Sequence, residues 1–266
     1  MTQELIKCLS NSNPNPDAAL LEGILTGHPE LSLNAMILLE DGRNDTPLNL
    51  VCGWLNELEL VTCLLRHNAD PNIQGAYKKV SLHNAQNLDT IALLRDHGAT
   101  LNLRDNEDKL PLHCAFDIDH ARALIGGDVV IDTPYRDNKT LFSNVVFNAN
   151  GDYTFAKNLV TELGASIETN IWNNISRYEA HRLHTYDFIG FLIKHNAPLD
   201  VSDLKTTNPT FYDFLHGAVH HAFRTIHANY VQSDDSLLPH EDAGAEYQAT
   251  VDALAQQFGL LGNADE

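Results

Sequence analysis

Two histidines four positions apart, His216 and His220, have the spacing of a metal-binding pair. They fall with Asp213 and His227 on the polar face of a helix predicted over 209–230. Side chains four residues apart on a helix share one face, so such a pair can bind one ion. However, "HGAVH" lacks the glutamate that follows the first histidine in zinc proteases, and spacing identifies no third ligand. We therefore expect no cofactor, and keep His216 and His220 as an alternative metal pair.

The cysteines give no sign of nucleophilic or redox chemistry. The chain has four cysteines, which show neither a CxxC spacing nor a disulfide framework: Cys8, Cys52, Cys63 and Cys114. Three of them lie in apolar segments, where thiols are usually buried and inert. The chain also lacks a GxSxG turn, a glycine-rich phosphate loop and a kinase-like set of motifs. We expect a protein of a reducing compartment that is not an enzyme.

Aromatic and basic side chains spaced along the chain indicate binding to another protein, because such side chains dominate interface hot spots. They fall on successive predicted loops, or near a predicted turn: Trp54, Tyr77, Lys78, Arg104, Tyr135, Arg136 and Trp172. Each residue alone is better explained as surface decoration or as packing against the next loop. As a series along one edge, they form our candidate partner-binding strip.

The sequence that contains these residues has an internal repeat. "LELVTCLLRHNADPN" (58–72) is followed thirty residues later by "LDTIALLRDHGATLN" (88–102). Similar endings recur at 126–132, 163–168 and 195–200, and a second element recurs upstream of them at 46–52, 80–85, 110–115 and 140–146. Each unit thus has two short apolar-periodic segments around a polar turn, which predicts helix, turn, helix.

The predicted helix ends agree with this pattern. Thr46 offers a capping hydroxyl, and Pro47 suits the first helical position. Glycine or asparagine follows the second segment, where a left-handed residue would end the helix: Asn68, Gly98, Gly164 and Asn196.

The residues at the start and end of each unit resemble those of ankyrin repeats. Thr46-Pro47-Leu48 and Pro111-Leu112-His113 resemble the family's start, and Ala69-Asp70-Pro71-Asn72 resembles its end. The resemblance is clear over 39–132 and degenerate over 133–200. It implies an all-α solenoid of about five helix-turn-helix units, with projecting loops and a concave face. It also implies that His83 and His113 are structural and bond to neighbouring backbone.

Two units depart from the family pattern. From Asn49 to Leu58 is nine residues, whereas His83 to Leu88 and His113 to Ile118 are five each. We therefore expect the first helix or its turn to be shortened by about one helical turn in these units.

The ends of the stack need caps with one polar side. Leu20, Leu21, Ile24 and Leu25 have helical spacing and predict an amino-terminal cap within 16–34. We expect the solenoid with this cap to span 1–202, and a carboxy-terminal helical cap or extension to span 203–266.

Charge limits the partners. The formal net charge of −19 would repel nucleic acid phosphates and anionic membranes, so we expect neither as a partner. No stretch is apolar enough for a membrane span, and the amino terminus lacks the basic and apolar regions of a signal peptide, so we expect a cytoplasmic protein. The repeats also resemble those of stand-alone ankyrin proteins of intracellular bacteria. That resemblance implies an effector exported by a specialised secretion system into a host cytosol.

The leading hypothesis is a monomeric, non-enzymatic module that binds a partner protein through its loops and concave face. An alternative is a small metal-binding or catalytic appendage formed by 203–266 with the irregular unit 169–200, and targeted by the repeats. A third interpretation is homo-oligomerisation through the final helix.

Overall fold

The computed structural model describes residues 3–9, 17–38, 42–55, 58–149, 152–168, 188–192, 195, 213, 216 and 217. The chain divides into two compact units, 1–141 and 142–266. The predicted boundary between 202 and 203 lies outside the described residues and stays a prediction. Among the described residues, no helix is both long and apolar enough to span a bilayer.

The first unit is a series of short helical elements in consecutive pairs. They are α1 (Gln3–Leu9), α2 (Ala18–Gly27), α3 (Pro47–Leu50), the π-helix η1 (Val51–Leu55), α4 (Leu58–Arg66), the 3-10 turn η2 (Ala76–Lys78), α5 (Ser81–Asn84), α6 (Leu88–Asp96), the 3-10 helix η3 (Pro111–Cys114), α7 (Ile118–Ala123) and the 3-10 turn η4 (Arg136–Asn138). The helical repeat fold expected from the sequence is therefore present in this unit.

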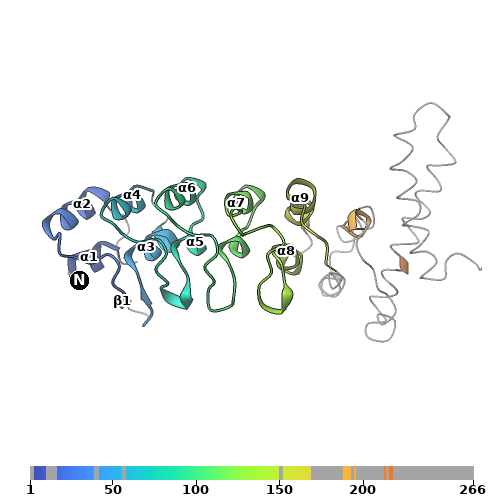
Figure 1. The fold of residues 1–266 in the computed structure, drawn as a ribbon, viewed down its shortest axis with the longest axis horizontal. Helices are drawn as coiled ribbons and strands as arrows, with labels where there is room; N and C mark the ends of the chain where they lie inside the picture. The colour runs from blue at the N-terminus through green and yellow to red at the C-terminus, as the bar shows by residue number, and fades with distance from the viewer. Residues whose placement is uncertain are drawn as a thin grey trace, which may run out of the picture. The chain divides into compact units, whose positions relative to one another are not determined.

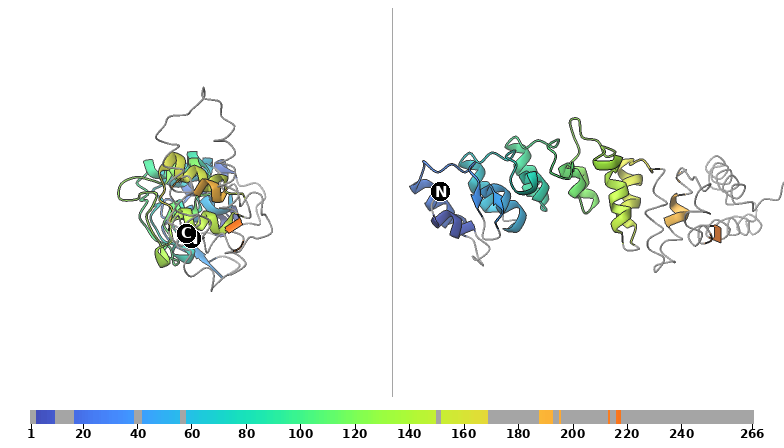
Figure 2. Two further views of the ribbon diagram at one scale, coloured as in Figure 1. Left: turned by 90° about the vertical axis from the view of Figure 1, so that its right-hand side faces the viewer. Right: turned by 90° about the horizontal axis from the view of Figure 1, so that it is seen from below.

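The pairs form two layers within the first unit. Helices α2, α4, α6 and α7 pack in succession in one layer, and α3, α5 and η3 pack in succession in the other (Figure 1). Figure 2 shows the same order of pairs from below. The core between the layers is formed by fully buried side chains such as Leu48, Leu64, Leu82, Leu94 and Leu112. Burial of each contributes about 1.5–3 kcal/mol to hydrophobic stabilisation.

Local sequence sets the ends of these helices. Thr46 caps α3 by accepting a 3.2 Å hydrogen bond from the backbone N–H of Asn49, and Pro47 is its first residue, as predicted. Asn68, Gly98 and Gly164 adopt φ of 65°, 86° and 69°, which confirms three of the four predicted left-handed stops. The fourth, Asn196, lies outside the described residues.

The amino-terminal cap has one more helix than we predicted. Helix α2 confirms the helical spacing within 16–34, and Asp17 caps it through a 2.8 Å bond from the N–H of Ala19. Leu21, Ile24 and Leu25 are buried, but Leu20 is 52% exposed. Helix α1 packs against α2 and was not predicted, because its seven residues are too few for a periodic signal.

The shortened units are confirmed. Helix α5 has four residues, and the corresponding element η3 is a four-residue 3-10 helix. In the preceding unit, α3 runs directly into the five-residue π-helix η1. The missing turn is thus removed from the end of the first helix, and the layer that contains it still packs continuously.

The described residues also contain one short pair of strands that the all-α prediction did not include. Strands β1 (Ile37–Leu38) and β2 (Asn44–Asp45) pair antiparallel, with Ile37 opposite Asp45 and Leu38 opposite Asn44. Gly42 between them has a φ of 83°, which a glycine adopts at little cost. The first loop of the repeat array is therefore a β-hairpin.

The described part of the second unit contains α8 (Leu141–Asn148), which begins at the boundary, and α9 (Thr154–Leu163). The rings of Tyr153 and Phe188 stack with centroids 4.1 Å apart and an interplanar angle of 1°. Both side chains are buried. This contact joins the start of α9 to a segment about thirty-five residues later in the chain.

Substitutions of two glycines, one after a helix and one inside a helix, test whether local backbone conformation sets the stability of these elements. Gly98→Ala should lower the free energy of unfolding by about 1–2 kcal/mol, because a residue with a Cβ is strained at this left-handed φ. Gly23→Ala should raise it by about 0.5–1 kcal/mol, because Gly23 lies inside α2 with a negative φ. Both sites have open space around the added methyl group, so sterics do not contribute. Urea unfolding of both variants gives the two values, and equal signs would contradict this account.

Candidate interaction surface

Four loops extend beyond the α3, α5 and η3 layer (Figure 1). We name them loop 1 (the described residues 38 and 42–46), loop 2 (71–80), loop 3 (101–110) and loop 4 (131–140). Loop 1 belongs to the β-hairpin, and loops 2 and 4 contain the turns η2 and η4. All four belong to the first unit, so their mutual arrangement is defined.

Loops 2, 3 and 4 close in the same way at intervals of thirty residues. A backbone N–H donates to the carbonyl four residues later in each loop: Gly75 to Lys79 at 2.8 Å, Asp105 to Lys109 at 2.9 Å and Tyr135 to Lys139 at 2.9 Å. Left-handed residues turn the chain inside each closure: Tyr77, Lys78, Asp108, Asp137 and Asn138. The thirty-residue repeat of the helices is thus also the repeat of the loops.

Hydrogen bonds join each loop to the next. The Gln74 amide donates to the Arg104 carbonyl at 2.8 Å, and the Arg104 guanidinium donates to the Pro134 carbonyl at 3.1 Å. In the other direction, the N–H of Asn106 donates to the Tyr77 carbonyl at 2.9 Å. Arg136 completes the series with a 3.4 Å bond to the Asn106 carbonyl. The three loops therefore form one connected surface.

Two buried histidines fix the loops to the short inner helices. His83 Nδ1 accepts from the N–H of Val80 at 3.2 Å, and its Nε2 donates to the Lys109 carbonyl at 3.0 Å. His113 repeats this with Leu110 at 2.9 Å and Thr133 at 2.8 Å. An Nδ1 that accepts a hydrogen bond carries no proton, so both rings are neutral Nε2–H tautomers. The predicted structural role of His83 and His113 is confirmed.

A groove of about 210 Å³ lies between loops 1 and 2 and the inner helices. Its lining comes from loop 1 (Arg43 and Asp45), from α3 and η1 (Asn49, Leu50 and Gly53), and from loop 2 and α5 (Ala76, Tyr77, Lys79 and Asn84). The wall is therefore built by segments that are up to forty-one residues apart, and it offers both cationic and amide side chains.

Asn49 holds the two sides of this groove together. Its amide nitrogen donates to the carbonyls of Ile73 and Lys79, both at 3.1 Å, and its oxygen accepts from the Ser81 hydroxyl at 2.7 Å. Burial raises the pKa of Asp45, opposed by hydrogen bonds from Asn49 and from the backbone. The groove wall is consequently fixed by buried polar contacts rather than by flexible surface side chains.

The residues of the predicted partner-binding strip fall into different environments. Tyr77 is 58% exposed, and Lys78 and Arg136 are also exposed. Arg104 bonds to Asp108 as well as to Pro134, with a 2.7 Å bond to the Asp108 carbonyl. The Tyr135 ring packs 4.6 Å from the His113 ring. Arg104 thus bonds to loop 4, and Tyr135 packs against η3. Tyr77 and Lys78 face solvent, and Arg136 is exposed although it also bonds to loop 3.

The structure does not describe the side chains of the two tryptophans of the strip. The backbone of Trp54 lies in η1, next to the groove residue Gly53, but its side chain lies outside the described part of the chain. Trp172 lies outside the described residues altogether. The strip as a whole stays a prediction.

Sequence reasoning did not identify several groove residues, namely Arg43, Asn49, Lys79 and Asn84. Asn49 occupies an ordinary first-helix position, and Lys79 is adjacent to the predicted Lys78. Only the adjacency to Lys78 could have indicated one of them. The others come together because α3 packs against α5 and loop 1 contributes Arg43 to the same groove.

The described thiols are unsuited to nucleophilic chemistry. Burial raises the pKa of Cys52 to about 12. Burial, with the nearby Glu22 carboxylate, also raises the pKa of Cys63 to about 12. Desolvation raises the pKa of Cys8 and Cys114 as well. Because the thiolate is the nucleophile, these four groups stay in the unreactive thiol form at neutral pH.

The alternative metal pair is only partly placed. Asp213 and His216 are described, with Asp213 exposed and His216 half-buried. His220 lies outside the described residues. The pair His216 and His220 therefore stays a prediction.

Comparison with known proteins supports the repeat. The family model described as "Ankyrin repeat" matches residues 43–76. These residues include β2, α3, η1, α4 and the start of η2. A comparison with curated proteins gives no match.

The buried histidines predict a pH dependence of stability. Burial lowers the pKa of both His83 and His113, opposed by their bonds to backbone carbonyls. The unfolded chain, with histidine pKa values of about 6.5, therefore binds protons before the folded protein does. Stability should be complete above about pH 6.5 and fall as the pH is lowered from there toward 5.

Chemical unfolding across this pH range checks the prediction. In the His83→Gln/His113→Gln variant, the free energy of unfolding should change less steeply with pH than in the wild type. His97→Gln is the matched control, because that ring is exposed, and its slope should equal that of the wild type. A slope unchanged in the double variant would contradict the assignment.

Proposed function

We propose that this protein binds a segment of a partner protein in the groove between loops 1 and 2, with the exposed side chains of loops 2 and 4 adding contacts. An ankyrin repeat indicates a protein-protein interaction module, and the matched residues 43–76 contribute most of the groove wall. This coincidence of the repeat with the groove is the observation that carries the proposal.

The size of the groove favours part of a protein over a free small molecule. Pockets for drug-sized ligands and cofactors measure about 300–1,000 Å³, whereas this groove has about 210 Å³. That volume suits one or two side chains of a peptide segment. Arg43, Lys79 and Asn84 on its wall offer donors to an acidic or carbonyl group of that segment.

Tyr77 supplies an aromatic contact at the rim. Its φ of 57° is uncommon for a bulky residue, and the bond from Asn106 to its carbonyl holds this conformation. The ring is left 58% exposed beside Lys78. Tyrosine is enriched among interface hot spots, so this exposed ring is a candidate for burial against a partner.

The more detailed expectations stay predictions. They are the solenoid of about five units, the monomeric state, the cytoplasmic location, and export into a host cell as a bacterial effector. The groove and loops support binding of a protein, and binding alone is compatible with a role inside or outside the cell of origin.

Partner capture followed by a measured affinity tests the proposal. The full chain is used to capture proteins from lysate, and the partner so identified is purified. Titration calorimetry then compares the wild type with Tyr77→Ala/Arg136→Ala, which removes two exposed loop side chains. We expect the variant to bind at least about 10-fold more weakly, as for truncated hot spots.

A second variant tests the groove itself. A Cβ on Gly53 would meet the Asn84 side chain at 3.4–3.6 Å, an ordinary contact that narrows the groove without a clash. Gly53→Ala should therefore keep the fold and weaken binding.

The matched control is Leu20→Ala/Arg122→Ala, which removes an exposed apolar and an exposed basic side chain from α2 and α7 in the other layer. Its affinity should equal that of the wild type. Wild-type affinity in both the loop and Gly53 variants, or equal losses in the control, would reject this surface.

A further inference from the structure

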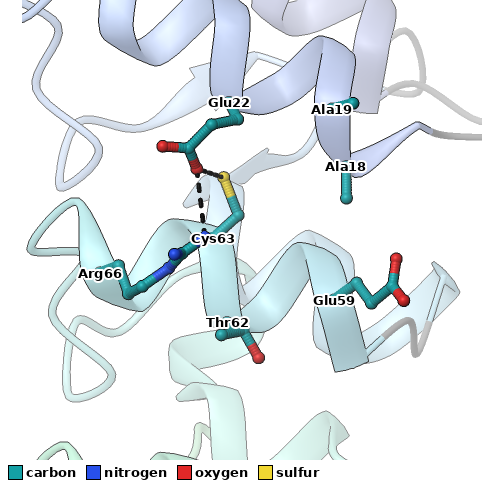
Figure 3. Close-up of a pocket in the computed structure, with 7 residues that line it drawn as sticks. All are labelled: Ala18, Ala19, Glu22, Glu59, Thr62, Cys63 and Arg66. Carbon is teal, nitrogen blue, oxygen red and sulfur yellow. Dashed lines mark hydrogen bonds and ion pairs between the residues drawn. The ribbon is translucent and has the colours of Figure 1, made fainter.

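Three side chains with metal-ligating atoms meet between α2 and α4, in the layer away from the loops. Cys63 lies in the last turns of α4, and His67 follows four residues later. The N–H of His67 bonds to the Cys63 carbonyl at 3.2 Å, so both residues lie on one face of the same helical turn. Glu22 reaches them from α2, as Figure 3 shows for Cys63.

The distances between these ligand atoms suit one metal ion. Glu22 Oε2 is 3.2 Å from Cys63 Sγ, and Glu22 Oε1 is 3.1 Å from His67 Nε2. All three ligand atoms lie within 4.8 Å of one another. Zinc bonds of about 2.0–2.3 Å in a tetrahedron place ligand atoms about 3.3–3.8 Å apart. Small side-chain rotations are therefore enough to bring the three groups onto one ion.

The repeat itself does not demand this cluster. Thirty residues after Cys63, the same place in α6 is taken by Leu93. The histidine equivalent to His67 is His97, whose Nδ1 lies 2.9 Å from the Leu93 carbonyl of its own helix. His67 instead directs its Nε2 to Glu22 of another helix. Compared with the next unit, the thiol of Cys63 is therefore a change of residue type, and His67 differs from His97 in its partner, Glu22.

The cluster has an opening to solvent. A cavity of about 360 Å³ is lined by Glu22 and Cys63, together with Glu59, Thr62 and Arg66 (Figure 3). Arg66 lies 3.4 Å from Glu22 Oε2, and its side chain is 64% exposed. The positive guanidinium thus lies beside the carboxylate, and most of its surface is in solvent.

We propose that Glu22, Cys63 and His67 form a zinc site that joins α2 to α4, with the fourth coordination position open to the cavity. Thiolate and imidazole ligands favour Zn²⁺ over the oxygen-preferring Mg²⁺ and Ca²⁺. The ion would link the amino-terminal cap to the first full repeat. It would therefore stabilise the end of the stack without contacting the groove between loops 1 and 2.

Metal binding at this site involves no redox change. The Cys63 thiol releases one proton to solvent as its sulfur bonds to the ion, and His67 binds the ion through a nitrogen lone pair of its ring. Glu22 binds as a carboxylate, and water fills the open position. The thiolate and carboxylate together neutralise the two charges of Zn²⁺.

The test uses the full-length protein, reduced and stripped with a chelator. Calorimetry with Zn²⁺ should show one strong site per chain, and the thermal midpoint should rise on zinc addition because the ion binds the folded state. Co²⁺ should give a sulfur-to-metal charge-transfer band and the visible bands of a tetrahedral ion. Absence of strong binding, or of the charge-transfer band, would overturn the proposal.

Variants locate the ion. Cys63→Ala and Glu22→Gln should each weaken zinc binding by roughly 100-fold or more, since even outer-shell changes cost 10–100-fold. His97→Gln, the equivalent histidine of the next unit, should bind like the wild type. Glu22→Gln changes a partly exposed residue, so it keeps the test valid if Cys63→Ala does not fold. Zinc binding retained in Glu22→Gln, or lost only in His216→Ala/His220→Ala, would place the ion elsewhere.

Discussion

The fold of the first unit depends on hydrogen bonds that buried side chains make to the backbone of the next loop. Loops 2, 3 and 4 contain little regular secondary structure, so their carbonyls need partners from outside each loop. His83 and His113 supply them at an interval of thirty residues. Asn49 does the same for loop 2. Each inner helix thereby fixes the loop that follows it, and unpaired groups at these buried places would be costly.

This arrangement divides the first unit into two faces with different chemistry. On the loop side, fixed backbone leaves a groove and an exposed Tyr77. The other face is formed by α2, α4, α6 and α7. Among the described residues, it carries the cluster of three possible metal ligands, Glu22, Cys63 and His67. The proposed partner binding and the proposed zinc site therefore lie on different faces and can be tested by separate mutations.

The first turns of the inner helices support the loops on the proposed binding side. His83 and His113 lie three residues after Val80 and Leu110, where α5 and η3 begin. Arg104 bonds to the Pro134 carbonyl of loop 4, and the Tyr135 ring packs against His113 of η3. By residue type and position in the repeat, Arg104 and Tyr135 were as good candidates for partner contact as Tyr77. Internal hydrogen bonding and ring packing, which no residue type reveals, separate them.

The sequence by itself determined the repeat period, the helix pairs, the Thr46 cap, the left-handed stops and the structural histidines. These features depend on residues a few positions apart or on a regular interval, so local chemistry suffices to specify them. The tertiary structure decided which polar side chains are already satisfied, how loop 1 forms a hairpin, and that Glu22 meets Cys63 across forty-one residues. Such contacts arise only when helices from different units pack, because packing brings together groups whose separation in the chain carries no periodic signal.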